Sequence, residues 1–252
     1  MNRRKFLKTI PALATLTGAA AFADQTEQIA PFFSENHDSS FAQDSNTTTP
    51  GNLQPIVLVK PEKEGGKGVL TAIQQRQTVR SIKPDKLPPQ MLSNLLWAAF
   101  GINRDSIRGG RTGRTAASAS NSQEIDLYVA LTEGVYIYEA SNHRLVPVVA
   151  GDFRTRSGRG AAATAPVNIF FVVDLAKYNK GQPQEPNLKD PEGQKSYYFV
   201  DTGLIAQNIY LFAASQGLAA WFHNCDKTNT PKEFNLRPEQ RVLFSQTVGY
   251  PA

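Results

Sequence analysis

The sequence predicts a mixed α+β domain in which helices pack against a sheet. Three observations support this prediction: segments of helical periodicity come first, a run of short strands follows, and helix and strand alternate in the last third. No internal repeat interrupts this order. With 252 residues, of which 40% are hydrophobic and 19% charged, the chain can bury one substantial core.

Two helices are expected before the first long strand. Residues 69–77 predict a short helix. A stronger helix follows Pro84 and the Pro88-Pro89 pair, because proline suits the first helical turn, and Gly101 suits its end. The apolar face of this second helix is formed by Met91, Leu92, Leu95, Leu96 and Ala99.

Strands are expected from the middle of the chain onwards. Residues 125–131, 135–138 and 145–149 read as strands, and the first two are joined at Glu133-Gly134. Residues 167–173, VNIFFVV, form a continuous apolar run with many β-branched side chains. Such a run predicts a strand at the centre of the sheet.

The last third of the chain is the most regular. Residues 196–216 are apolar on nearly every side, which predicts a helix buried in a core or in a subunit interface. Asp201 offers an alternative helix start, with residues 197–200 belonging to the approach. Strands at 218–222 and 242–248, separated by a short helix near Pro231 to Phe234, complete the domain.

The N-terminus predicts export followed by a tether. A basic start, Arg3 to Lys8, precedes a mild apolar stretch, and residues 21–23 give a small-x-small cleavage pattern before Asp24. The basic part resembles a bacterial twin-arginine signal, with an ordinary secretory signal as the alternative. We therefore expect a periplasmic or otherwise exported protein. Residues 24–55 are rich in Ser, Asp, Asn, Thr and Gln and predict a disordered linker before a domain of residues 56–252.

Charge and hydropathy exclude some partners. The formal net charge of +5 falls to +1 once the four basic residues of the signal are removed, so a nucleic-acid partner is not expected. No apolar run is long enough to span a bilayer, so stable membrane insertion is not expected either.

Several common sites are excluded by the residues present. Cys225 is the only cysteine, so neither an internal disulfide nor a cysteine-based metal cluster can form. The three histidines, His37, His143 and His223, have no close spacing, and no metal site is expected. The sequence also lacks a Gly-x-Ser-x-Gly elbow, a Walker loop and a Gly-x-Gly-x-x-Gly turn.

Two polar segments are candidates for ligand binding. Arg76, Thr78 and Arg80 offer two guanidinium groups and a hydroxyl, which suit a phosphate, although two exposed arginines also fit a solvated face. Residues 116–123, AASASNSQ, place small polar side chains directly before a strand. Small side chains let the backbone approach a ligand closely, with a plain polar turn as the alternative.

Together with three further motifs, these segments resemble the nitroreductase family of FMN enzymes. The motifs are Arg76-Gln77-Thr78-Val79-Arg80, residues 95–101 (LLWAAFG), residues 117–123 (ASASNSQ), residues 201–211 (DTGLIAQNIYL) and residues 248–251 (VGYP). Within the family, the chain is similar to the branch that includes azoline-oxidising dehydrogenases of peptide-modification clusters. The resemblance spans about residues 56–251 and implies a mixed, mainly antiparallel sheet flanked by helices in a homodimer.

The resemblance also implies where FMN binds. The family places its phosphate on the first segment, which is Arg76, Gln77, Thr78 and Arg80 here. The ribityl chain and ring edge fall to Ser118, Ser120 and Asn121, with Gln123 either in contact or supporting the loop.

Reaction chemistry is implied at two further places. A backbone amide faces flavin N5 in the family and is expected here from Asn224 or Cys225. Lys177-Tyr178 is a possible counterpart of a Lys-Tyr pair that serves proton transfer in the azoline-oxidising relatives, with a surface turn as the alternative.

Two departures from the family pattern concern the phosphate and the loop. Ala117 replaces a proline, which makes the polar loop less rigid. The chain ends at Ala252, where many relatives continue with further basic residues. The phosphate is therefore expected to depend on the two arginines of the first segment alone, or on an additional arginine. The candidates are those of residues 104–114 and Arg154, Arg156 and Arg159.

The expected function is that of an FMN-dependent oxidoreductase, which transfers a hydride or electrons through flavin N5 to or from a small organic substrate. NAD(P)H is not expected outside the inner membrane, so the protein would use another donor or oxidise an exported substrate. One alternative is an exported, non-catalytic flavin- or ligand-binding module on the same fold. A structural envelope protein without flavin is another.

Overall fold

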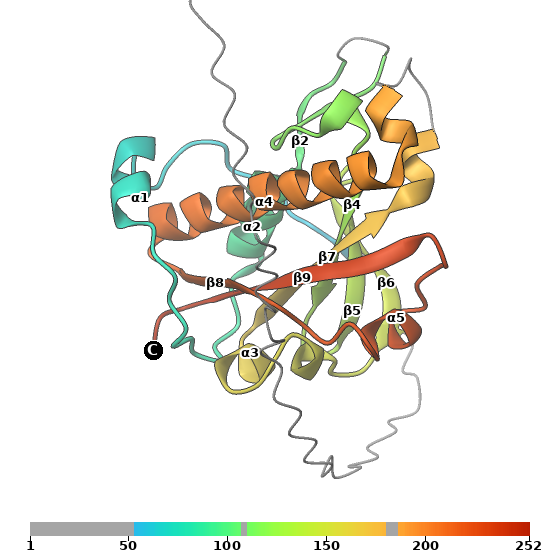
Figure 1. Ribbon diagram of the computed structural model, residues 1–252. Helices are drawn as coiled ribbons and strands as arrows, with labels where there is room; N and C mark the ends of the chain where they lie inside the picture. The colour runs from blue at the N-terminus through green and yellow to red at the C-terminus, as the bar shows by residue number, and fades with distance from the viewer. Residues whose placement is uncertain (1–52, 107–109, 180–185) are drawn as a thin grey trace, which may run out of the picture. The chain divides into compact units, whose positions relative to one another are not determined.

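The computed structural model describes residues 53–106, 110–179 and 186–252 (Figure 1). The predicted export signal and residues 24–52 of the predicted linker lie outside the described residues. The domain is an α+β structure, as the sequence predicts, and its large sheet has seven strands.

Every pairing in the large sheet is antiparallel. The strand order is β1-β6-β5-β4-β7-β9-β8. The strands are β1 (Ile56–Val57), β4 (Ile125–Ala130), β5 (Gly134–Glu139), β6 (Arg144–Ala150), β7 (Val167–Asp174), β8 (Ala219–His223) and β9 (Gln240–Gly249). The expected central strand is β7, which is buried along its whole length between β4 and β9.

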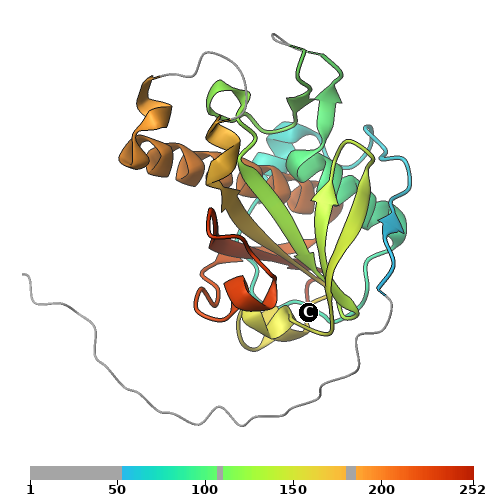
Figure 2. The same ribbon diagram turned by 90° about the vertical axis from the view of Figure 1, so that its right-hand side faces the viewer.

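The helices are α1 (Val69–Gln75), α2 (Pro89–Phe100), α3 (Ala161–Thr164), α4 (Pro191–Gln216) and α5 (Thr230–Glu233). A second, two-stranded sheet pairs β2 (Ile102–Arg104) with β3 (Gly113–Arg114). Short 3-10 turns cover residues 119–121, 154–156, 175–179 and 186–189. In Figures 1 and 2, α4 runs across the strands, with α1 beside its C-terminal end.

The alternation of side chains along the strands divides the core between the two faces of the sheet. One set, which includes Leu127 and Phe171, packs against α2 and α4 through residues such as Leu96 and Ile209. Because successive strand residues point to opposite faces, the neighbouring set packs on the other side around Phe234, which follows α5. This second set includes Tyr128, Ala130, Phe170, Val172 and Val242.

Helix α4 starts earlier than the sequence predicts. Asp190 caps it by accepting a hydrogen bond from the Gly193 N–H at 2.8 Å, and Pro191 occupies its first turn. The alternative start at Asp201 is therefore wrong, because Asp201 lies inside the helix and is buried. The first turn of α4 is polar, so apolar periodicity does not reveal where the helix starts. Its end is normal, since Gly217 adopts a left-handed conformation with φ of 71°.

Other boundaries differ by one to three residues from the predicted ones. The first helix ends at Gln75, which leaves Arg76 at its C-cap and the rest of the expected phosphate segment outside helices and strands. Strands β5, β6, β8 and β9 match the predicted runs with small extensions. The two-residue strand β1 and the small sheet were not predicted, because each is too short to show a period.

Candidate functional site

The first segment expected to bind the cofactor, residues 76–80, lies alongside strand β8. The N–H of Val79 donates to the carbonyl of Ala220 at 3.0 Å, which joins the segment to the strand. Tyr210 on α4 adds a second link. Its hydroxyl lies 3.0 Å from the Thr78 hydroxyl and accepts the Phe222 N–H at 2.8 Å. One side chain thus ties α4, β8 and the segment together.

Arg76 and Arg80 keep their charges available. The Arg76 guanidinium lies 5.4 Å from the ring centroid of Tyr210, and that of Arg80 lies 5.7 Å from Trp221. In the described parts of the chain, no carboxylate pairs with either arginine. Two permanent cations that are held only by aromatic rings are suited to an anionic ligand.

Five of the alternative phosphate arginines are engaged elsewhere, while Arg108 lies outside the described residues. Arg154 is paired with Asp152 and donates to the carbonyls of residues 164 and 165. Arg156 is held by Glu233 through two nitrogens and by Asp226 through a third. Arg104, Arg111 and Arg114, from the loop region, donate to side chains or carbonyls close by. These contacts neutralise or occupy groups that a phosphate would need.

A cavity of about 430 Å³ adjoins the segment. Its lining includes Lys67, Arg76, Gln77 and Tyr210, with Pro251 from the C-terminus. The volume lies in the usual range of small-molecule sites. The two cations in the lining, together with the apolar side chains of α4, suit a ligand that has both a charged and an apolar part.

The second expected segment, residues 118–123, is a strained turn. Ser120, Asn121 and Gln123 all have positive φ, between 50° and 52°. Side chains hold the turn: Ser118 accepts from the Gln123 N–H at 3.0 Å, and the Asn121 amide donates to the Thr112 carbonyl at 3.2 Å. Positive φ is uncommon outside glycine and often marks a functional position.

The side chain of Gln123 supports this turn. It donates to Asn121 and to the carbonyl of Thr112, and it accepts from Arg114 at 2.8 Å. Ser120, by contrast, is exposed, and its hydroxyl has no partner among the described residues. Of the expected ribityl contacts, Ser120 is thus the most available, whereas Ser118 and Asn121 also stabilise the turn itself.

A buried carboxyl pair lies beneath the turn. Glu124 and Asp201 are hydrogen-bonded to each other, and their side chains are almost completely buried. Asp201 also accepts the Ala119 N–H at 3.0 Å, and Ser122 donates to Glu124 at 2.5 Å. Burial and the nearby Glu124 raise the pKa of Asp201 to about 8, so the pair holds a proton at neutral pH.

Lys177 and Tyr178 lie next to this pair. The Lys177 ammonium pairs with Asp126 and donates to the Gln123 carbonyl at 3.2 Å. Tyr178 is buried, and burial raises the pKa of its hydroxyl far above the ordinary value. The expected reaction pair is thus next to the polar turn rather than on a remote surface, but its hydroxyl faces the protein interior.

The expected N5 segment directly follows β8. Asn224 is exposed and Cys225 is half-buried. Burial raises the pKa of the Cys225 thiol to about 12. Since Trp221 lies over Arg80 and its ring is 4.3 Å from that of His223, the first segment and the N5 segment form one cluster.

The polar turn belongs to a different region of the same chain. It contacts α4 at Asp201, whereas the first segment contacts α4 at Tyr210. Nine residues separate these contacts, which corresponds to about 13 Å along the helix axis. Figure 2 shows the turn, in light green, near the N-terminal half of α4. One chain therefore holds two halves of the expected site some distance apart.

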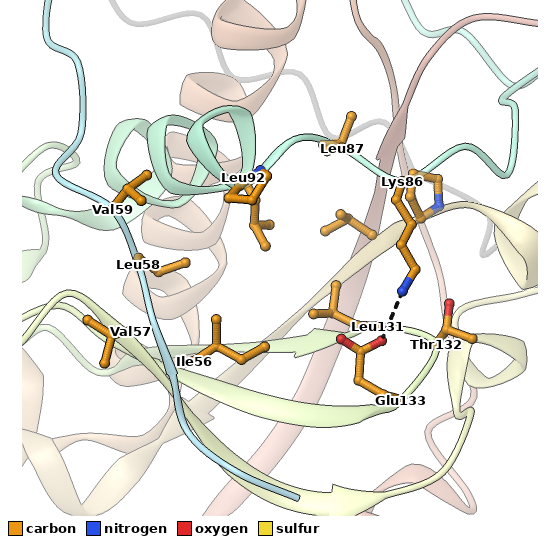
Figure 3. A pocket seen from close by; sticks show the side chains of 13 residues that line it. Ile56, Val57, Leu58, Val59, Lys86, Leu87, Leu92, Leu131, Thr132 and Glu133 are labelled. Atoms are coloured by element: carbon orange, nitrogen blue, oxygen red, sulfur yellow. Dashed lines mark ion pairs between the residues drawn. The ribbon is translucent and has the colours of Figure 1, made fainter.

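A second cavity, of about 150 Å³, lies away from these residues. Figure 3 shows its apolar lining, which includes Ile56, Leu58, Leu92 and Leu131. At its edge the Lys86 ammonium lies 3.9 Å from a Glu133 carboxylate oxygen. None of the residues expected to bind the cofactor lines this cavity.

Sequence reasoning missed four residues of these clusters, namely Glu124, Asp201, Tyr210 and His223, as site residues. Tyr210 and Asp201 fall inside a helical motif, where they read as core positions. A carboxylate in an otherwise apolar helix was the one available signal. In the described residues, no group of His, Cys, Asp and Glu could hold a metal ion, and no helix is both long and apolar enough to cross a membrane.

Comparison with known proteins assigns these features to one family. The model of the nitroreductase family matches residues 73–250. A curated nitroreductase homologue from Methanocaldococcus jannaschii is 25% identical over 186 residues, which cover 69% of this chain and 87% of that protein.

Solved structures show the same relationship. A nitroreductase homologue from Ralstonia eutropha is 30% identical, with a TM-score of 0.70, over 81% of this chain and 93% of its own. The E. coli microcin synthetase McbBCD complex with truncated pro-MccB17 bound contains a chain with a TM-score of 0.58 and 17% identity. That match covers 80% of this chain and 79% of the other. At this identity the second likeness shows a shared fold alone.

Proposed function

Because the chain belongs to the nitroreductase family, we propose that it is an exported, FMN-dependent oxidoreductase acting on a small organic substrate. One observation supports FMN best. Arg76 and Arg80 have no carboxylate partner among the described residues, and they lie beside the strand that leads into Asn224 and Cys225.

The residues present fit such a cofactor. Arg76 and Arg80 would hold the phosphate, with Thr78 adding a neutral donor. The adjoining cavity of about 430 Å³, which Arg76 lines but Arg80 does not, leaves room for a small molecule beside α4. The N–H of Asn224 or Cys225 would face the ring, and Ser120 would meet polar atoms at its edge.

When bound, FMN supplies the transfer of a hydride or of single electrons. The chain's own residues would bind, orient and polarise the cofactor. Arg76 and Arg80 would hold the anionic end, and the N–H groups after β8 would present positive potential to the ring. The carboxyl pair of Glu124 and Asp201 fixes the polar turn. No separate nucleophile is needed for such a reaction.

We also propose a homodimer, because it would bring together the two separated halves of the site. A second copy could place its turn at residues 118–123 against the first segment of its partner. Exposed apolar side chains support association: Leu70 on α1 is 79% exposed and Val200 on α4 is 59% exposed. The others are Val69, Ile73, Phe199 and Leu204. Apolar groups grouped on helix faces are typical of subunit interfaces.

The proposed location rests on the basic N-terminal signal, Arg3 to Lys8, and on the cleavage pattern before Asp24. Export of an already folded protein is compatible with a cofactor loaded in the cytoplasm. The electron donor would then differ from the soluble nicotinamide cofactors.

The first test is a visible absorption spectrum of the full chain, produced in the bacterial cytoplasm and purified without added flavin, with mass identification of any released chromophore. We expect one FMN per chain. A colourless protein that also takes up no added FMN would contradict the proposal. Turnover with artificial donors and acceptors then separates an enzyme from a flavin-binding module.

A further inference from the structure

His223 ends strand β8, immediately before the two residues whose amides are candidates for the cofactor ring. Its Nδ1 lies 2.8 Å from the carbonyl oxygen of Asn224, and its Nε2 lies 2.8 Å from the Thr247 hydroxyl. The Thr247 hydroxyl in turn lies 2.6 Å from the side-chain oxygen of Asn168. Thr247 and Asn168 are fully buried.

The protons in this chain of contacts can be assigned from the groups involved. The Asn168 amide nitrogen donates to the Ala162 carbonyl at 2.8 Å, which fixes the Asn168 oxygen toward Thr247. That oxygen only accepts, so the single Thr247 proton goes to it. Thr247 then has no proton for His223, and Nε2 must donate.

The other ring nitrogen is assigned in the same way. A backbone carbonyl only accepts, so Nδ1 must donate to Asn224. Both nitrogens of His223 are therefore donors, and an imidazole with two N–H groups carries a positive charge.

His143 is an internal comparison, because each of its ring nitrogens contacts a hydroxyl group. Ser93 donates its proton to the Val59 carbonyl, so Nε2 of His143 donates to Ser93. The Tyr138 hydroxyl, 3.0 Å from Nδ1, can donate its own proton. His143 thus satisfies its contacts as a neutral ring, whereas His223 does not.

We propose that His223 is a positively charged positioning residue that orients the Asn224–Cys225 peptide toward the cofactor. This deepens the proposed function and rests on it only for the role of the cofactor. In a planar trans peptide the C=O and N–H point in opposite directions. The Asn224 oxygen points to His223, so the Cys225 N–H points away from the His223 imidazole. This orientation selects Cys225 over Asn224 as the cofactor-facing donor.

Among the described residues, no carboxylate forms an ion pair with His223. Thr247 and Ser245 on β9 and Asn168 on β7 present neutral groups, as do Ser157 and Gly158. The Arg80 guanidinium lies over the Trp221 ring, whose centroid is 4.3 Å from that of His223. Burial lowers the pKa of His223, while the Asn224 carbonyl opposes that shift. In a neutral His223 ring, the unprotonated nitrogen would face an oxygen that is also an acceptor, which raises the cost of losing the proton.

The test is a pH titration of the ring nitrogens by NMR on the full chain without flavin. His223→Gln and His143→Gln variants assign the signals. We expect the titration midpoint of His223 to lie above that of His143, because only the contacts of His223 require both ring protons. Thr247→Val should lower the His223 titration midpoint by about one pH unit, whereas Thr247→Ser should preserve it.

A His223 midpoint at or below that of His143, or a midpoint that Thr247→Val leaves unchanged, would overturn the proposal. The second readout adds FMN and follows backbone amide signals. The Cys225 N–H should shift more than that of Asn224, and the reverse would also overturn the assignment. If FMN does not bind at all, the proposed function fails, yet the ring titration still decides the charge.

Discussion

The carboxyl groups of Glu124 and Asp201 share a hydrogen bond under the turn formed by residues 118–123. Glu124 directly precedes strand β4, and Asp201 lies near the middle of α4, so the pair joins helix, sheet and turn. Two buried carboxylates this close cannot both be charged at low cost, and one proton remains between them.

This pair predicts a stability that falls as pH rises. The pKa of Asp201 is raised to about 8 in the folded protein, while an unfolded chain releases this proton near pH 4. The stabilisation is therefore complete below about pH 4 and is lost as pH rises through about 8. Melting temperatures from pH 5 to 9 measure it, and the decline should be steepest in the upper half of that range.

Asp201→Asn should flatten this decline, because an amide keeps an oxygen for the Ala119 N–H and an N–H for Glu124 without titrating. Glu192→Gln, on the exposed first turn of the same helix, is the control and should keep the slope of the wild type. An unchanged pH profile in Asp201→Asn would exclude the shared proton.

Removing the Tyr210 hydroxyl should destabilise the protein by about 1–3 kcal/mol, because Tyr210→Phe leaves the Phe222 N–H without an acceptor. Urea unfolding measures this. Tyr250→Phe is the control, since its hydroxyl has no partner among the described residues, and it should change stability by less than about 0.5 kcal/mol. Equal stabilities of the two variants would argue against the Tyr210 link.

The two unpaired arginines should recognise the phosphate rather than the ring. In Arg76→Gln and Arg80→Gln, FMN affinity should fall by about 10-fold or more, while affinity for riboflavin, which lacks the phosphate, stays the same. Fluorescence titration of the flavin-free protein measures both. Arg241→Gln, on an exposed part of β9, should leave both affinities unchanged. An equal loss for the two flavins would place these arginines elsewhere in the site.

The strain at Ser120 predicts opposite effects of two substitutions. Ser120→Gly should stabilise the protein by up to about 1 kcal/mol, because glycine adopts a φ of 50° without steric cost. Ser120→Val should destabilise it by about 1–2 kcal/mol, since a β-branched residue is poorly tolerated there. Thermal unfolding distinguishes the two, and a stabilising valine would show that the turn is not strained.

The large elements could be predicted because each has a strong local signal. The run from Val167 to Val173 is apolar at every position except Asn168, and it forms the buried central strand. Pro89 and Gly101 mark the ends of α2, as expected from their restricted and permissive backbones. The start of α4 was missed because its first turn is polar and is defined by the Asp190 cap, which an apolar period does not reveal.

The candidate site was predictable only in part. Sequence motifs indicated Arg76, Arg80 and residues 118–123, because each motif occupies one short stretch of the sequence. The partners Tyr210, Thr247 and Asn168 could not be found, because their roles depend on contacts across strands and helices distant in the chain. Choosing between Asn224 and Cys225 needs a backbone orientation, which no residue pattern encodes.

The slow reaction expected of the Cys225 thiol can be used to measure local opening of the segment after β8. With a pKa of about 12, it reacts with thiol reagents at pH 8 on the order of 10³-fold more slowly than a free cysteine. Any faster labelling therefore measures how often the segment after β8 detaches. For the same reason, a fluorophore attached to a cysteine engineered on the surface would mark that position alone, with no need to remove the native residue.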